Sequence, residues 1–167
     1  TNSTITVPFV VARSGDIYQL SEPGKEVGYH LGSSNGYSNT TESYQTIGIE
    51  ISNFGPLKLK PNTNVLLDAY GKEFCTLTDT QHYTKLDKPF RGYSYFADYT
   101  ELQYDALKLL IEDLCEKFAI PKTSVGPSKH FELCVADAKK AGVSSHSNWR
   151  GDKSDLAPNF DWSKIGF

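Results

Sequence analysis

Glu50 is the residue whose surroundings point most directly to chemistry. It stands inside the short apolar run Ile47-Gly48-Ile49-Glu50-Ile51, which has the length and composition of a β-strand. A carboxylate in such a run must be paired, linked to a metal, placed at a strand end facing a cleft, or kept neutral by a raised pKa. The alternative is that Glu50 points to solvent from a half-buried strand. Glu50 is therefore a candidate site residue.

His146 and Asp155 lie nine positions apart in a polar, turn-rich segment and could reach one centre. Imidazole and carboxylate both bind zinc, and a catalytic zinc usually has three protein ligands plus a water. A surface histidine and a capping aspartate would explain the same two residues without a metal. Lys153, two residues before Asp155, could place a cation beside a developing oxyanion. An exposed lysine is the simpler explanation for it.

Two pairs of neighbouring residues could border a binding cleft. Tyr29-His30 lies at the edge of a glycine-rich loop, where an aromatic ring and an imidazole suit contact with a sugar or a peptide. A hydrogen-bonded structural histidine explains His30 equally well. Trp149-Arg150 follows His146 closely, and a flat ring beside a fork of donors suits polar ligands.

The elements that must position these residues begin with strands. Alternating apolar residues over 5–11, a turn at 13–15 and a return over 17–20 predict a β-hairpin. Pro8 lacks a backbone donor, so it predicts that the first strand lies at a sheet edge or is bulged. Turn-forming residues over 21–44 predict a loop. Residues from Pro56 to about Pro89 predict an insertion of short strands and turns.

A helix over residues 101–118 is the clearest predicted element. Thr100 and Gln103 match a capping box, and Pro121 ends the pattern. One apolar face is predicted by the helical spacing of Leu107, Leu110, Ile111, Leu114 and Phe118. A shorter helical stretch is expected within 133–141. Strands followed by a packed helix predict an α/β (α+β) fold, with a mixed central β-sheet flanked by helices.

Composition limits the classes of protein. The 167 residues are 38% hydrophobic with a net charge of −3, which predicts a single domain over residues 1–167. We expect no nucleic-acid partner and no membrane span, because there is no Lys/Arg block and no run of ~18 apolar residues. The spacing of Cys75, Cys115 and Cys134 predicts free thiols, with a Cys115–Cys134 bridge as the alternative in an exported protein. The sequence contains no methionine, which favours a processed or excised chain.

Five stretches of the sequence together resemble one family. They are FVVARSGDIYQL at 9–20, YHLG at 29–32, IGIEISN at 47–53, the helix that ends at Ile120-Pro121, and the segment from His146 to KSDLAPNFDW at 153–162. Their order and approximate spacing are similar to those of the zinc-dependent N-acetylmuramoyl-L-alanine amidases of the peptidoglycan-recognition-protein and phage-lysin type. The resemblance covers nearly the whole chain.

The resemblance implies a hydrolase that cleaves the amide between N-acetylmuramic acid and the L-alanine of the peptidoglycan stem peptide. It implies zinc held by His146 and Asp155, with Glu50 as the general base and Lys153 stabilising the oxyanion. The implied substrate contacts are Tyr29, His30, Asn53, Trp149 and Arg150. The implied partner is peptidoglycan or a muropeptide, and the implied location is the cell envelope, either periplasmic or secreted.

One departure from the family concerns the metal. The family takes its first zinc ligand from a histidine on a strand upstream of the hairpin, and none of the four histidines here occupies that place. We therefore expect an N-terminally incomplete amidase domain, with an upstream fragment of the same gene product as a further partner. The alternatives are a non-catalytic domain that binds peptidoglycan or muropeptides, and a nonstandard third ligand.

Overall fold

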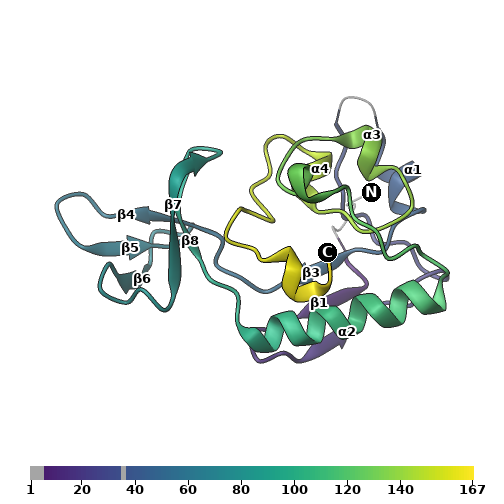
Figure 1. Ribbon diagram of the computed structural model, residues 1–167, viewed down its shortest axis with the longest axis horizontal. Coiled ribbons are helices and arrows are strands. Elements are labelled where there is room, and N and C mark those ends of the chain that lie inside the picture. The colour runs from purple at the N-terminus through teal and green to yellow at the C-terminus, as the bar shows by residue number, and fades with distance from the viewer. Residues whose placement is uncertain (1–5, 35–36) are drawn as a thin grey trace.

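A computed structural model describes residues 6–34 and 37–167 of the chain as two β-sheets with helices packed around the first (Figure 1). The first sheet has the strand order β2-β1-β3 and the second the order β6-β5-β4-β8-β7. The strands are β1 (Phe9–Val11), β2 (Ile17–Gln19), β3 (Ile49–Ile51), β4 (Pro56–Leu59), β5 (Val65–Leu67), β6 (Glu73–Thr76), β7 (Tyr83–Phe90) and β8 (Tyr93–Ala97). The helices are α1 (Asn39–Ser43), α2 (Glu101–Lys117), α3 (Val135–Ala138) and α4 (His146–Trp149), with 3₁₀ turns at Pro127–Lys129 and Trp162–Ile165.

The first sheet is mixed, as predicted. β1 and β2 form the antiparallel hairpin, and β3 pairs with β1 in parallel, with Glu50 opposite Val10. The prediction from Pro8 of an edge or bulged strand is wrong, because β1 is the central strand. The strand begins at Phe9, after the proline, so no ladder hydrogen bond is lost.

Helix α2 confirms the predicted capping box and uses it to contact the first sheet. The Thr100 side chain accepts the Gln103 N–H at 3.1 Å, and the Gln103 side chain accepts the Thr100 N–H at 3.1 Å. The same two side chains also donate to Arg13 and Ser52 carbonyls, each at 2.8 Å. Arg13 follows β1 and Ser52 follows β3, so the start of the helix is tied to the ends of both strands.

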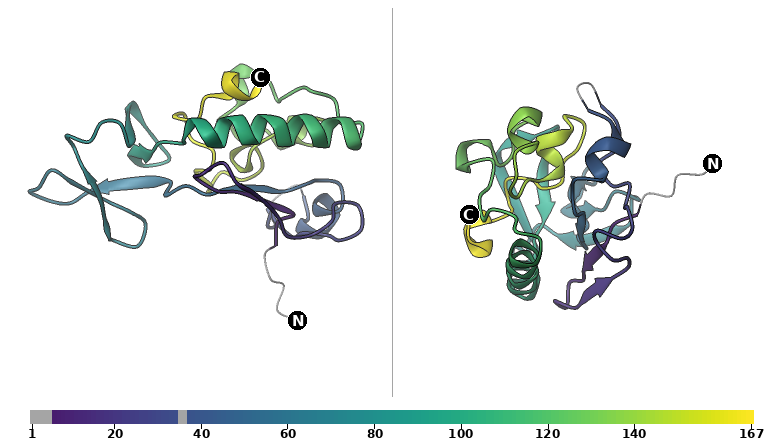
Figure 2. Two further views of the ribbon diagram at one scale, coloured as in Figure 1. Left: turned by 90° about the horizontal axis from the view of Figure 1, so that it is seen from below. Right: turned by 90° about the vertical axis from the view of Figure 1, so that its right-hand side faces the viewer.

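The main core lies between the first sheet, α2 and the C-terminal segment, and Figure 2 shows the helix lying along the sheet. Phe9 and Val11 of β1 are buried against the predicted apolar face of the helix. Burying a large aliphatic side chain contributes about 1.5–3 kcal/mol, so this face attaches the helix firmly. The buried residues of the cluster on α2 and after it include Tyr104, Leu107, Leu110, Ile111, Leu114, Phe160, Trp162 and Ile165.

The second sheet extends to one side of the molecule and has its own small core of Leu57, Leu66 and Ala97 (Figure 1). It runs to Ala97, past the predicted limit near Pro89. Helix α1 lies within the segment predicted as loop, where the Ser38 side chain caps its first turn.

The described cysteines are unbridged. In the described part of the chain, no helix is long and apolar enough to cross a bilayer.

Candidate functional site

Five of the predicted site residues line one cavity of about 1060 Å³, namely Glu50, His146, Asp155, His30 and Trp149. Glu50 comes from β3, His146 begins α4, and Asp155 lies in the loop that follows α4. Glu50 and Asp155 also line a second, smaller cavity of about 120 Å³. Residues from distant parts of the sequence therefore line the same cavity.

The electrostatic surroundings of Glu50 place its carboxyl group close to three other charged groups. Burial raises the pKa of Glu50, and the Asp155 carboxylate raises it further, while the charges of His146 and Lys153 lower it. Glu50 is exposed by its surface area, but it lines both cavities. The protein around it therefore still disfavours the charged carboxylate, and the net effect is a raised pKa. A carboxylate with a raised pKa is suited to exchange protons nearer neutral pH.

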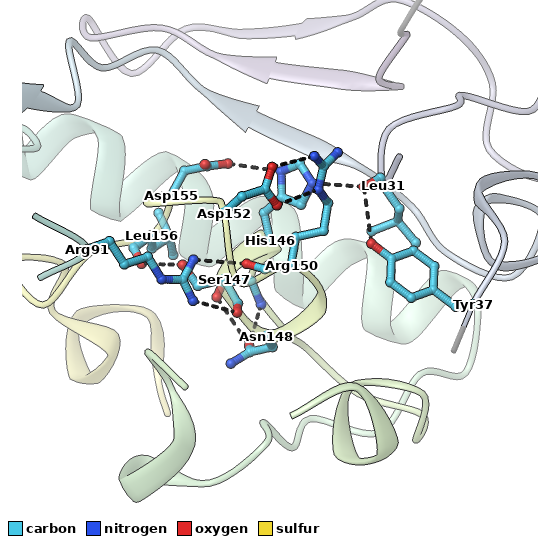
Figure 3. A network of polar contacts seen from close by, with 11 residues as sticks. Leu31, Tyr37, Arg91, His146, Ser147, Asn148, Arg150, Asp152, Asp155 and Leu156 are labelled. Carbon is cyan, nitrogen blue, oxygen red and sulfur yellow. Dashed lines mark hydrogen bonds and ion pairs between the residues drawn. The ribbon is translucent and has the colours of Figure 1, made fainter. Parts of the chain in front are cut away.

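His146 and Asp155 are hydrogen-bonded to each other (Figure 3). The His146 Nδ1 atom lies 3.0 Å from Asp155 Oδ2, and its Nε2 atom lies 3.0 Å from the Leu31 carbonyl oxygen. Both partners are acceptors, so both ring nitrogens must donate for both bonds to form. Desolvation raises the pKa of Asp155, but the hydrogen bond from His146 and the charges of His146 and Lys153 outweigh it and leave the pKa lowered.

A small set of polar contacts positions the loop that carries these two residues. Asn148 is fully buried, and its amide donates to the carbonyls of Lys129, His130 and Glu132 at 2.9–3.2 Å. The Ser147 N–H donates to the Asp155 carbonyl at 2.9 Å, which brings the two ends of the loop together. The loop is thus held by the Asn148 side chain, which bonds carbonyls of the 129–132 segment, and by a backbone hydrogen bond between its own ends.

The described residues do not fit a three-ligand zinc centre. Within 6–34 and 37–167, no three His, Cys, Asp or Glu side chains are grouped so that they could hold a metal ion. The two candidate donors are bonded to each other, and the second ring nitrogen of His146 faces a carbonyl. A histidine binds a metal through a neutral ring nitrogen, so zinc could bind His146 only if the hydrogen bond at one of its two ring nitrogens were given up.

Two of the predicted substrate-contact residues lie directly against glycines. A Cβ atom on Gly48 would come within 2.6 Å of the His30 ring, and one on Gly32 within 2.3 Å of the Arg150 guanidinium. His30 bonds the Gly28 carbonyl at 2.6 Å and the Thr46 hydroxyl at 2.9 Å. Burial lowers the pKa of His30, the Gly28 carbonyl raises it, and the charge of His146 lowers it. His30 therefore lies beside the site with both ring nitrogens already engaged.

The other predicted contact residues have mainly structural partners. Trp149 is 3% exposed, packs edge-on against Tyr37 and donates to the Ser144 hydroxyl at 3.0 Å. The Asn53 amide donates to the Ala97 and Asp98 carbonyls. A hydrogen bond with Tyr44 raises the pKa of Tyr29. Contact of these three residues with a substrate stays a prediction.

Two side chains near the site were not anticipated from the sequence. Tyr99 lines both cavities, and its pKa is raised by burial and then by Tyr104 and the carboxylates of Asp155 and Glu50. Arg91, from the turn between β7 and β8, bonds the backbone of the α4 segment. The sequence gives only a weak indication of Tyr99 as a site residue, namely that it directly precedes the helix cap Thr100. For Arg91 it gives none, because its partners are backbone atoms far along the chain.

Comparison with known proteins confirms the family that the sequence resembles. The sequence model of one family, described as N-acetylmuramoyl-L-alanine amidase, matches residues 2–158. No curated protein and no solved structure matches the chain. Since the match extends over nearly all of the sequence, this chain belongs to the N-acetylmuramoyl-L-alanine amidase family.

Proposed function

We propose that this chain hydrolyses the amide between the lactyl group of N-acetylmuramic acid and the L-alanine of the stem peptide. Family membership supports amidase chemistry on peptidoglycan in general. The observation that supports the specific proposal is the meeting of Glu50, His146 and Asp155 at one cavity, with the charge of Lys153 close by. Because the substrate is cell wall, the proposed place of action is the cell envelope.

Glu50 is the general base in this proposal. Its raised pKa brings the carboxylate nearer the optimum for proton transfer at neutral pH. It accepts a proton from the water that attacks the amide carbon, and returns that proton to the amine as the C–N bond breaks. Lys153 balances the negative charge that develops on the amide oxygen.

A non-catalytic domain that binds muropeptides is the second candidate function. The observation that favours it is the bonding of His146, whose two ring nitrogens are occupied by Asp155 and by the Leu31 carbonyl. A binding domain requires a cavity with polar groups and no metal. The two functions therefore differ in turnover and in zinc content.

The deciding experiment measures products and metal on the same protein. The chain is dialysed against zinc, its metal content is determined, and it is incubated with a defined muropeptide whose products are separated by chromatography and mass. Release of a stem peptide with a free L-alanine amine supports the amidase. Intact muropeptide retained without cleavage supports the binding domain, and neither cleavage nor retention overturns both.

His146→Ala tests the metal directly. We expect this variant to lose any zinc that the wild-type chain takes up, because only Asp155 of the two candidate ligands remains. Uptake equal to that of the wild type would mean that zinc binds elsewhere on the chain.

A further inference from the structure

Arg91 occupies the turn between β7 and β8 of the second sheet. The φ angles of Arg91 (49°) and Gly92 (86°) are both positive, which is typical of a two-residue type I′ hairpin turn. Side chains other than glycine, asparagine and aspartate are disfavoured in this region. The turn itself therefore gives no reason for an arginine at this position.

The guanidinium of Arg91 donates two hydrogen bonds to backbone carbonyls of the α4 segment (Figure 3). Nη1 lies 2.9 Å from the Arg150 oxygen, and Nη2 lies 3.1 Å from the Ser147 oxygen. The last carbonyls of a helix have no partner within the helix, and α4 has only four residues. The planar fork of an arginine can reach two such carbonyls at once, which a lysine cannot match.

The two carbonyls belong to the loop that orders His146 and Asp155. The Ser147 N–H donates to the Asp155 carbonyl at 2.9 Å, and the Arg150 N–H donates to the His146 carbonyl at 3.0 Å. The residues that Arg91 contacts are therefore the same residues whose amides bond the backbone of the two candidate site residues.

The second sheet also contacts the strand that carries Glu50. Asn53 lies just after β3, and its amide donates to the carbonyls of Ala97 and Asp98 at 3.2 Å. Close to Arg91, the Phe90 ring packs against the Phe131 ring with 6.5 Å between centroids. The second sheet thus contacts both parts of the chain that supply the site. The end of β8 bonds Asn53, just after the strand that carries Glu50, and the β7–β8 turn bonds the segment that carries His146.

Charge supports the same placement. Burial lowers the pKa of Arg91, while the carboxylates of Asp155, Asp152 and Glu132 raise it. The guanidinium is therefore a partly buried cation that interacts electrostatically with Asp155, one of the candidate site residues.

We propose that Arg91 is a positioning residue of the candidate site. It attaches the loop carrying His146 and Asp155 to the second sheet, and so keeps both side chains in place relative to Glu50. The effect on catalysis rests on the proposed amidase function, whereas the effect on the loop does not.

Arg91→Gly tests the attachment, because glycine suits the turn and the substitution removes the guanidinium together with the rest of the side chain, including its contact with the Phe90 ring. Hydrogen exchange measured by mass spectrometry should be faster by about tenfold or more in peptides covering 147–155, since two hydrogen bonds from a charged group are lost. Exchange in α2 should not change. Arg91→Lys should recover part of the protection.

Asn62→Gly is the matched control. Asn62 also has a positive φ (59°) in a turn of the second sheet, and among the described contacts none joins it to residues 146–155. It should leave exchange in 147–155 unchanged. Unchanged exchange in Arg91→Gly, or an equal increase throughout the chain, would overturn the proposal.

Muropeptide cleavage gives the second readout. Arg91→Gly should lower kcat with little change in KM, Arg91→Lys should recover part of it, and Asn62→Gly should match the wild type. Full kcat in Arg91→Gly would overturn the role in positioning. A wild-type chain that cleaves nothing would reject the proposed function, and hydrogen exchange would still decide whether Arg91 holds the loop.

Discussion

The strand that carries Glu50 and the loop that carries His146 and Asp155 are held by different kinds of contact. β3 pairs with β1 in a parallel ladder, and Gln103 of α2 bonds the Ser52 carbonyl just beyond it. The loop contains one four-residue helix. It is attached chiefly by the side chains of Asn148 and Arg91, which donate hydrogen bonds to backbone carbonyls.

This difference predicts different responses to substitution. A ladder distributes its stability over main-chain hydrogen bonds that a side-chain substitution leaves in place. A loop attached by a few side chains loses a large share of its support with each one, and buried carbonyls are left without partners. Substitution of Glu50 should therefore change the chemistry alone, whereas substitution of a loop anchor should change the structure first.

The largest expected effect is that of Glu50→Gln on turnover. Loss of a general base should lower the rate of muropeptide cleavage by about 10²–10⁴-fold. The free energy of unfolding in urea should not fall, because burial already disfavours the charged carboxylate. Glu116→Gln, an exposed position on α2, is the control and should keep full turnover. Normal turnover in Glu50→Gln would remove Glu50 from the role of base.

Asn148→Ala should have the largest effect on stability. The substitution leaves three backbone carbonyls, of which that of His130 is buried, and the Ser145 N–H without the partner they have in the wild type. We expect a loss of about 2–4 kcal/mol in the free energy of urea unfolding. Asn64→Ala, at an exposed position in the turn before β5, should change it little. A loss below about 1 kcal/mol in Asn148→Ala would contradict the view that the loop depends on single side chains.

The pH dependence of cleavage tests how the two regions interact. Glu50 is an effective base only when ionised, so the rate should fall as pH decreases through its pKa, which lies above the ordinary 4.5. The charge of Lys153 lowers that pKa, so Lys153→Met should move the acidic limb of the profile to higher pH. Lys108→Met on the exposed side of α2 is the control. An unmoved limb in Lys153→Met would separate Lys153 from Glu50.

The smallest expected effect is at an exposed ion pair of the second sheet. Lys60 Nζ lies 3.0 Å from Glu73 Oε1, and the two side chains are 47% and 65% exposed. Lys60→Ala should therefore cost only about 0.2–1 kcal/mol in urea unfolding. A loss as large as that of Asn148→Ala would mean that surface contacts and loop anchors are not energetically distinct.

The elements predicted correctly are those whose signals are local. The Thr100–Gln103 box and the spacing of leucines along the helix indicate α2 because both arise within a few turns of one helix. The run around Glu50 indicates a strand for the same reason. The edge position suggested by Pro8 failed because strand order is decided by pairing with β3, forty residues further along the chain.

The site was only partly predictable. Glu50, His146 and Asp155 stand out by residue type, but the bond from His146 to the Leu31 carbonyl and the two bonds from Arg91 join atoms that no sequence pattern relates. Trp149 shows the same limit. Its position beside a candidate ligand suggests a cleft wall, and Trp149 does line the cavity, but no sequence pattern indicates its edge-on packing against Tyr37, which leaves it 3% exposed.

The sequence by itself determined the family, the long helix and the residue types available for chemistry, because these depend on the order and spacing of side chains along the chain. The tertiary structure alone decided that Glu50 shares a cavity with His146 and Asp155, that those two bond each other, and that the second sheet holds their loop. The physical reason is that burial, charge and backbone hydrogen bonds act between neighbours in space, and the loop's neighbours come from distant parts of the sequence.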